Sequence, residues 1–585
     1  MNSLINRQNI YNKEKPFSKV SSAFDLSHIH ATNHEIGKLI PVTSFLTLPG
    51  DRFKISIAFK TYMESLLKNG FYNLKMNFRA YWLPLNEMWP SFRSFISGGR
   101  SGNFQAIPPK FQIDNTNDLK HTLADYFGYS LKKNKTYKVN AFQWMMYDLI
   151  YYWYFINQHV EKNLPYIITD EDNTLDNIPG LCSNRQFYDK SSNMYIRMFK
   201  NFDNYKQFLM EAGYPEIALD NDAPKLLNFV YNVNYVKDRY TSAHLTQQLG
   251  TPPTLPVDIN AAFNFNNNEP DLELLKISAD NVSNVGNLII KQGQKIPEFN
   301  NNADNEANVV ASTDRLLLEN WNTLFKNVLN QTATSFSVPD LRLAFQTQII
   351  QEGTLLGGWE YQDYIKYFFG TDVGIDRIPS KPVYCGGFKT PLAISDVFST
   401  VATTDDPLGT YAGKSVTEDN QFLCDYVCKD FGILMIVAYV DVNGSFYGSQ
   451  GIPEEFNFHD RFDMVNPAFY HLSEQGINHN ELYLSTASST AKPFGFGGIY
   501  NVFRQKTDFI SGDLRDELSF WHSARFFNEV PNLNPEFLKV KQKDYDRLFA
   551  VSSDNFKPFI SAFGVKALAY RPLPELAVPG LIDHR

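Results

Sequence analysis

Few residues in this chain have the types and spacing that catalysis requires. Gly409 to Ser415 is similar to a phosphate-binding P-loop, but only three residues separate its glycines where the motif has four, so the loop could not wrap phosphates in the usual way. The sequence has neither the G-x-S-x-G motif of a nucleophilic serine nor the H-E-x-x-H motif of zinc enzymes. We therefore predict that the protein is not an enzyme and carries no cofactor.

Three short clusters contain side chains that bind metals: His28, His30 and His34; Cys424 and Cys428; and the acidic run 170–172. The histidines would share one face of a strand, since side chains alternate along a strand. Each cluster lacks the further ligands of a complete zinc or calcium site. Hydrogen-bonded histidines, buried thiols and a solvated loop are the simpler interpretations, and we predict no metal.

The composition excludes several classes of protein. The chain has 585 residues, 43% of them hydrophobic and 15% aromatic, which is enough apolar material for a large core. The four cysteines, Cys182, Cys385, Cys424 and Cys428, are too few for a disulfide scaffold, and we expect buried or free thiols in a reducing compartment. The net charge of −9 limits any nucleic-acid contact to a local patch. The longest apolar runs are far shorter than the roughly 20 residues that cross a bilayer, so we expect a soluble protein without membrane insertion.

The elements expected from hydrophobic periodicity are mainly strands. Residues 53–60 and 74–82 alternate as half-buried strands do, and 432–440 is apolar throughout, as in a strand buried on both faces. A strand is also expected over 481–485, and the glycine-rich run 494–498 reads as a tight turn or a flat packing surface. Helices are expected over 142–159, from Pro339 to Gly357 and over 359–369.

Two segments stand apart from this pattern. The first is a basic N-terminal arm, residues 1–23, which contains the four basic residues Arg7, Lys13, Lys15 and Lys19 and a single acidic residue among its first twenty. An ordinary frayed terminus is the alternative interpretation. The second is an asparagine-rich stretch, residues 260–308, with thirteen asparagines and seven acids against three lysines. It reads as an exposed excursion from the main body or as a disordered linker. From the residues alone, the chain is an assembling structural protein, with a sugar-binding surface protein as the next class.

A series of short motifs runs along nearly the whole chain: Phe24-Asp-Leu26-Ser27-His28, Leu48-Pro49-Gly50-Asp51, Tyr81 to Trp89, Leu341 to Gln346, Pro382-Val-Tyr384-Cys-Gly386-Gly387, Tyr439 to Gly451, Arg461 to Asp463, Glu474-Gln475, and the tail from Arg571-Pro572 to Pro579-Gly580-Leu-Ile-Asp583-His584. In their residues and their order, these motifs resemble those of the major capsid proteins of Microviridae, especially the gokushovirus-like branch. The tail is the most specific of them, and residues 100–335 match poorly.

The resemblance implies a mainly β fold, an eight-stranded antiparallel jelly roll of the viral capsid type with long, partly helical insertions. It also implies a major capsid protein of a small bacteriophage, self-assembling into a T=1 icosahedral shell around circular single-stranded DNA. The implied partners are other copies of the chain, a small basic DNA-binding protein, a pilot protein and a receptor on the bacterial host surface. The implied location is the virion, assembled in the host bacterial cytoplasm, and the basic arm would face the DNA.

On this basis we expect six segments: the arm 1–23, a first part of the jelly roll at 24–130, a helical insertion at 131–256, an exposed Asn-rich insertion at 257–310 that is the candidate three-fold protrusion, a helical and loop insertion at 311–430, and the second part of the jelly roll with its extended tail at 431–585. The competing class is a carbohydrate-binding or hydrolytic jelly roll. Its groove would need clustered tryptophans and acids, and the seven tryptophans are scattered along the sequence.

Overall fold

The structure is a computed structural model. It describes residues 21–68, 70–89, 92–97, 110–114, 120–129, 136–157, 229–248, 338–357, 381–393, 415–456, 463–484, 493–550 and 557–576, together with short pieces between them. The chain divides into two compact units, one formed by residues 1–247 and 372–585 and the other by residues 248–371.

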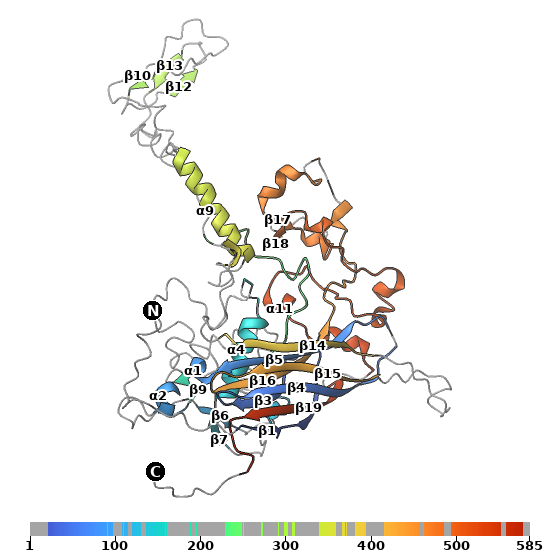
Figure 1. Ribbon diagram of the computed structural model, residues 1–585. Helices are drawn as coiled ribbons and strands as arrows, with labels where there is room; N and C mark the ends of the chain where they lie inside the picture. The colour runs from blue at the N-terminus through green and yellow to red at the C-terminus, as the bar shows by residue number, and fades with distance from the viewer. Residues whose placement is uncertain are drawn as a thin grey trace, which may run out of the picture. The chain divides into compact units, whose positions relative to one another are not determined.

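Two antiparallel β-sheets form the centre of the first unit (Figure 1). The first sheet has the order β1 (Ser22–Asp25), β19 (Phe559–Arg571), β4 (Arg52–Met63) and β15 (Ser415–Val427), and β2 (His28–His34) also pairs with β19. The second sheet has the order β14 (Val383–Pro391), β5 (Leu74–Pro84), β16 (Gly432–Val442) and β3 (Ile40–Thr47).

The order of these strands is that of a jelly roll. If β1 and β2 are counted as one interrupted strand, the strands in chain order lie 1-8-3-6 in the first sheet and 2-7-4-5 in the second. The chain therefore crosses between the sheets at every step except from β5 to β14, which are neighbours. The predicted mainly β, antiparallel fold is confirmed, and the count of eight is met only when β1 and β2 are taken together.

The two sheets pack face to face through aromatic side chains. On β4 the residues at positions 53, 55, 57 and 59 are buried while those between them are not, as the predicted alternation requires. The ring centroids of Phe59 and Phe78 lie 5.0 Å apart, and those of Phe78 and Phe563 lie 5.6 Å apart. These contacts join β4, β5 and β19 across the inter-sheet core.

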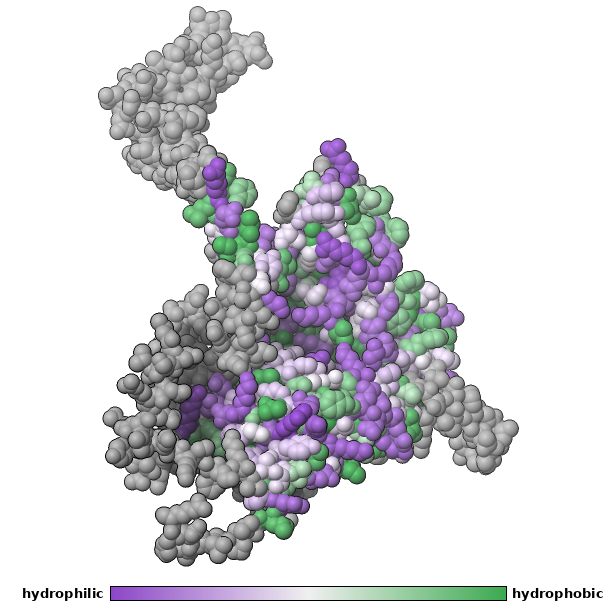
Figure 2. Space-filling view, viewed as in Figure 1, coloured by the Kyte–Doolittle hydropathy of each residue, from purple (hydrophilic) through white to green (hydrophobic). Residues whose placement is uncertain are grey.

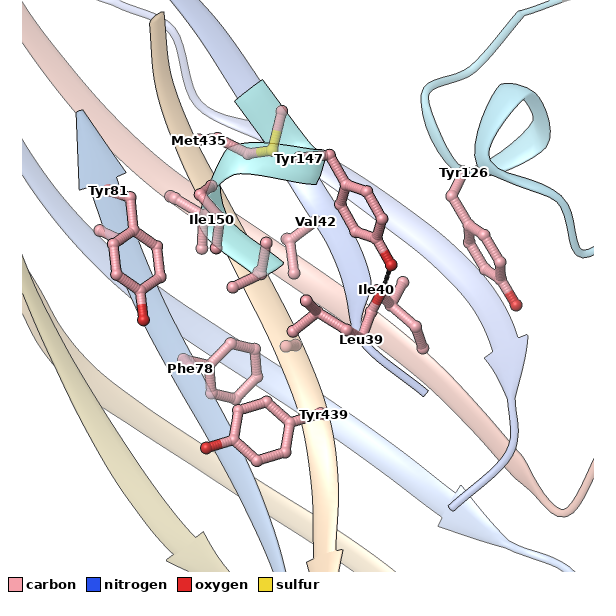
Figure 3. Packing of buried hydrophobic residues seen from close by; sticks show 14 of the residues in the cluster. Leu39, Ile40, Val42, Phe78, Tyr81, Tyr126, Tyr147, Ile150, Met435 and Tyr439 are labelled. Carbon is pink, nitrogen blue, oxygen red and sulfur yellow. Dashed lines mark hydrogen bonds between the residues drawn. The ribbon is translucent and has the colours of Figure 1, made fainter. Parts of the chain in front are cut away.

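Helix α4 (Phe142–Tyr154) covers part of the other face of the second sheet. Its Tyr147 hydroxyl donates to the carbonyl oxygen of Leu39 at 2.9 Å, as Figure 3 shows. Strand β16 lies between β5 and β3, with α4 over part of its outer face, and it is buried along its whole length, which confirms the prediction for 432–440. The prediction of a half-buried strand for 74–82 is wrong in its second half, where Tyr81 packs against Tyr154 of α4 with ring centroids 4.6 Å apart.

Smaller elements surround the sheets. The helices are α1 (Leu85–Met88), α2 (Phe92–Ser97), α3 (Leu123–Tyr126) and α11 (Pro535–Leu538), and one further sheet has the order β7 (Thr136–Asn140), β6 (Lys110–Asp114), β9 (Met194–Tyr195) and β8 (Tyr188–Asp189). The 3-10 helices are η6 (Glu454–Phe456), η7 (Pro467–Leu472), η8 (His479–Glu481), η9 (Asn501–Phe503), η10 (Gly512–Arg515), η11 (Ser519–Trp521) and η12 (Gln542–Leu548).

The structure corrects one expectation for the last third of the chain and decides against one of the two interpretations given for the glycine-rich run. Residues 481–484 are not a strand, because Asn478 caps the 3-10 helix η8: its side chain accepts from the backbone of Asn480, and Glu481 accepts from the backbone of Asn478. Of the two interpretations of the glycine-rich run 494–498, the tight turn is wrong, and the flat packing surface stays a prediction. Residues Gly495–Gly498 form strand β18, which pairs with β17 (Glu474–Ile477).

The second unit contains helix α9 (Val338–Gly357) and two short strand pairs, β10 (Asp271–Leu272) with β11 (Ile290–Lys291) and β12 (Glu298–Asn301) with β13 (Ala307–Val310). The helix begins and ends where Pro339 and Gly357 predict it. Of the expected helix 359–369, only residues 366–368 lie among those described, and they are helical. None of the described helices has the length and apolar character needed to cross a membrane.

Candidate assembly and nucleic-acid surfaces

The structure brings the first and the last motif of the sequence onto adjacent strands. Strand β1 is antiparallel to β19, with Ser22 opposite Arg571 and Phe24 opposite Ala569. The backbone N–H of Leu26 donates to the carbonyl of Ala567 at 2.8 Å, and the N–H of Ala567 donates to the Ser27 hydroxyl at 3.2 Å. The motif around Phe24, Leu26 and Ser27 therefore holds the strand that leads to Arg571.

The Pro49-Gly50-Asp51 turn meets the same end of β19. Asp51 is fully buried, accepts the backbone N–H of Leu48 at 2.9 Å, and lies 3.4 Å from the Nε of Arg571. Arg571 also donates through Nη2 to the carbonyl of Leu46 at 2.9 Å. Burial raises the pKa of Asp51, while the Leu48 N–H and the Arg571 charge oppose that rise. Two motifs more than 500 residues apart thus form one buried ion pair.

Tyr384, Gly386 and Gly387 lie on β14, at a bulge in its pairing with β5. A Cβ on Gly386 would lie 2.2 Å from the carbonyl oxygen of Leu423, and one on Gly387 would lie 2.5 Å from that of Phe78. Only glycine allows these close approaches. The Tyr384 side chain is 48% exposed. The two glycines are thus structural, and they leave the tyrosine standing at the surface.

Several predicted positions lie outside the described residues. They are Arg7, Lys13, Lys15 and Lys19 of the arm, Pro579, Gly580, Asp583 and His584 of the tail, the acidic run 170–172, Cys182, the first six residues of the P-loop-like segment 409–415, and most of the Asn-rich stretch. Pro572 is described and directly follows β19.

The three histidines of the N-terminal region each have their own partner. The Nδ1 of His28 lies 2.9 Å from the carbonyl of Leu26, that of His30 lies 2.8 Å from the carbonyl of Val42, and the Nε2 of His34 lies 2.9 Å from the Ser561 hydroxyl. Burial lowers the pKa of His34 to about 4. The hydrogen-bonded interpretation of this cluster is therefore correct. In the described ranges no three metal-binding side chains come together.

The described cysteines are free thiols. Cys424 and Cys428 are buried, and their burial raises the pKa of each to about 12. A thiol with such a pKa is protonated at neutral pH and is a poor nucleophile. The prediction of buried thiols is confirmed for these two residues.

The outer face of the first sheet is a candidate contact surface that sequence reasoning missed. Ion pairs join its strands, with Arg52 making two hydrogen bonds to Asp425 and Lys60 pairing with Glu418. Between them stand large apolar side chains that are 37–75% exposed: Ile29, Tyr62, Phe422, Ile560, Leu568 and Tyr570. Figure 2 shows one side of the molecule, on which hydrophobic and hydrophilic residues are likewise interspersed. The sequence pattern that could have predicted this surface is the alternation of inward-facing and outward-facing side chains along β4, β15 and β19.

The outer face of the second sheet has two adjoining recesses beside the end of α4, of about 270 and 370 Å³. Arg79, Tyr154 and Lys389 contribute to the walls of both. The Arg79 guanidinium lies 5.5 Å from the ring centroid of Phe155 and 5.6 Å from that of Tyr439. Sequence reasoning had no signal for these recesses, because three distant strands and a helix end form their walls.

Asp441 lies in the wall of the smaller recess. Its side chain is 6% exposed, and its Oδ1 has no hydrogen-bond partner among the described residues. Burial raises its pKa to about 6, against the opposing charges of Lys389, Arg79 and Lys75. A buried carboxylate oxygen without a donor is costly, so an N–H or O–H group that reached this atom would satisfy an unmet hydrogen bond.

The family model described as "Capsid protein (F protein)" matches residues 18–581 of the chain. The capsid protein VP1 of Chlamydia phage 1 is 23% identical over 616 aligned positions, which cover 96% of this chain and 95% of the relative. The capsid protein VP1 of Spiroplasma virus 4 is 29% identical over 258 positions, covering 43% and 46% of the two chains. The family match begins before β1 and ends after β19, so it includes every strand of both sheets.

Proposed function

Because this chain belongs to the capsid protein (F protein) family and is a phage capsid protein of the gokushovirus-like type, we propose that its copies form a T=1 icosahedral shell around circular single-stranded DNA. Membership in a capsid family implies an oligomeric shell and a place in the virion. The observation that carries the proposal is the match of residues 18–581, which spans the complete pair of sheets.

The surface of the first sheet supports assembly from many copies. A monomeric protein rarely exposes this many large apolar side chains on one sheet face. Shell subunits bury such side chains against neighbours, and heterologous contacts around closed symmetry axes require more than one contact surface. The relatives named above are structural capsid proteins, and no observation favours the alternative of a carbohydrate-binding or hydrolytic jelly roll.

The test is the particle size of the purified protein expressed alone, by light scattering and negative-stain imaging. Uniform closed shells are expected. A small species that stays small after the other phage proteins and single-stranded DNA are added would refute the proposal. A small species that assembles after this addition would support it and would show that assembly needs those partners.

We propose that the basic arm touches the packaged DNA. Arg7, Lys13, Lys15 and Lys19 would neutralise phosphates without reading sequence. Replacing all four with serine should lower the DNA content per particle, measured from the ratio of absorbance at 260 and 280 nm, while the yield of shells stays the same. Unchanged DNA content in intact particles would refute this role.

We propose that the tail crosses to a neighbouring subunit. Deleting the residues from Val578 onward, which removes Pro579, Gly580, Asp583 and His584, should leave a folded subunit that forms no shells. Normal particles from the shortened chain would contradict this.

The Asn-rich segment 257–310 remains the candidate three-fold protrusion towards a receptor on the bacterial surface. A small basic DNA-binding protein, a pilot protein and assembly in the host cytoplasm complete the proposal.

A further inference from the structure

The recesses on the outer face of the second sheet have a local charge opposite to that of the whole protein. The described walls of the smaller recess contain three basic residues, Arg79, Lys237 and Lys389, and one acidic residue, Asp441. The described walls of the larger recess contain Arg79 and Lys389 and no acidic residue. The chain as a whole carries a net charge of −9. A positive site of this kind on an acidic protein attracts an anion to one place.

The same walls are rich in aromatic rings. Tyr154, Phe155 and Tyr439 line the smaller recess, and Tyr81 and Tyr384 join Tyr154 in the larger. Figure 3 shows Tyr81 and Tyr439 rising from the neighbouring strands β5 and β16. Tyr384 is the most exposed aromatic residue in the described walls of the two recesses. It stands over Gly387, since a Cβ added at residue 387 would lie 2.7 Å from the tyrosine hydroxyl. The absence of a side chain at Gly387 lets the Tyr384 hydroxyl lie against the backbone of β14.

Asp441 adds a requirement for a hydrogen-bond donor. Its Oδ1 has no hydrogen-bond partner among the described residues, and Asp441 is the one acidic residue in the described walls of the smaller recess. A simple anion such as phosphate would satisfy the lysines but would place like charge near this carboxylate. A ligand that combines an anionic group, a flat ring and an N–H donor satisfies all three features at once.

Nucleotides have this combination of groups. The phosphate is the anion, the base presents a flat face to aromatic side chains, and each of the four DNA bases has an N–H on its edge. The two recesses, of about 270 and 370 Å³, lie near the lower end of the size range of small-molecule sites. That size fits one or two nucleotides of a strand whose remainder runs over the surface.

We propose that these recesses bind single-stranded DNA, with a base stacked on Tyr384, phosphates on Lys389 and Lys237, and Asp441 accepting an N–H from a base edge. This inference rests on the contact with single-stranded DNA proposed above, and it adds a second contact site, on the sheet and separate from the basic arm.

The experiment uses the full chain and a fluorescein-labelled 12-nucleotide single strand of mixed sequence, with fluorescence anisotropy as the readout. Tyr384→Ala should weaken binding roughly 5- to 150-fold, the loss expected for one stacked base. Lys389→Ser should make the slope of log Kobs against log salt concentration shallower by about 0.7, the value for one phosphate contact in single strands. An oligonucleotide of equal length with abasic sites should bind as weakly to the wild type as the normal strand binds to Tyr384→Ala.

Matched controls stand away from both the recesses and the outer face of the first sheet. Tyr470→Ala removes a tyrosine of similar exposure, 51%, and Lys68→Ser removes an exposed lysine. Both should bind the oligonucleotide as the wild type does. Photo-crosslinking of a strand that contains 5-bromodeoxyuridine should label β14, residues 383–391, and this readout does not depend on any variant.

Three results would overturn the inference. One is equal binding by the wild type, Tyr384→Ala and Lys389→Ser, which would leave the arm as the DNA contact. Another is no binding of the oligonucleotide by a wild-type chain that still forms shells, which would leave the capsid function intact. The third is loss of shells in Tyr384→Ala with unchanged DNA binding, which would assign the recesses to a subunit contact instead.

Discussion

His34 makes the jelly roll sensitive to acid. The histidine is 1% exposed and stacks on Phe559 with ring centroids 5.4 Å apart. Its Nδ1 lies 3.3 Å from the carbonyl of Glu35, so this nitrogen carries the proton and Nε2 accepts from Ser561, which in turn contacts Thr61 at 2.9 Å. Protonating Nε2 would bury a positive charge and reverse the direction of its hydrogen bond with Ser561, and the Glu35 carboxylate offsets part of the cost of the buried charge.

The size of the effect follows from the two pKa values. The pKa is about 4 in the folded chain and 6.5 in the unfolded one, so the unfolded state binds the proton first as the pH falls. The stabilisation is fully present above pH 6.5 and is lost between pH 6.5 and 4. The difference of about 2.5 pKa units corresponds to a stabilisation of about 3.4 kcal/mol at neutral pH. About 2 kcal/mol of this stabilisation is lost by pH 5.

The assay is urea unfolding of the purified subunit at pH 7.5 and pH 5.0, followed by tryptophan fluorescence. The wild type should lose about 2 kcal/mol more than His34→Gln between the two values. His28→Gln, which changes an exposed histidine on the same strand, should lose as much as the wild type. Equal losses in the wild type and His34→Gln would refute the reasoning. Other titrating groups are common to the three proteins and cancel in the comparison.

Two more predictions concern buried charges. Arg571→Ala should destabilise the subunit by roughly 2–4 kcal/mol in urea unfolding, because it removes a charged hydrogen bond to Leu46 and leaves Asp51 buried without its cation. Arg571→Lys should recover part of the lost stability. An Ala variant as stable as the wild type would contradict the role of the ion pair. Asp441→Asn should raise the free energy of unfolding at pH 8 by up to about 3 kcal/mol, because the folded pKa of about 6 lies above the unfolded value of 3.8, and the gain should disappear below pH 4. The measurement is the pH dependence of the unfolding midpoint, and a gain that is the same at pH 8 and pH 4 would rule out the carboxylate as its source.

Local patterns predicted the strands whose surroundings were simple. The alternation of β4 and the continuous apolar run of β16 were read correctly, because one faces water on one side and the other is covered on both. Strand β5 was predicted only in part, since the cover from α4 comes from a segment that periodicity within β5 does not reveal. The strand expected at 481–485 failed because the capping side chain of Asn478 outweighed β propensity.

The candidate sites divide in the same way. The motifs at Phe24, Asp51 and Arg571 could be recognised as strings of residues, but their meeting at one end of β19 depends on strand pairing across the whole chain. The recesses around Arg79 and Lys389 could not be predicted, because no short spacing relates β5, β14, β16 and the end of α4. Contacts between residues so far apart in the sequence can be identified only when the strand order of the sheets is known.

The place of β19 in the first sheet also sets the order of events during synthesis. This strand pairs with β1, β2 and β4, yet it is translated about 500 residues after them. Until residues 559–571 leave the ribosome, β4 lacks its neighbour β19, and the aromatic side chains that β4 directs into the core are incompletely covered. Strand pairs between residues so far apart in the sequence form slowly. A chain that terminates early would therefore lack a finished first sheet and its outer contact face. Completion of translation would then act as a checkpoint that keeps fragments out of the growing shell.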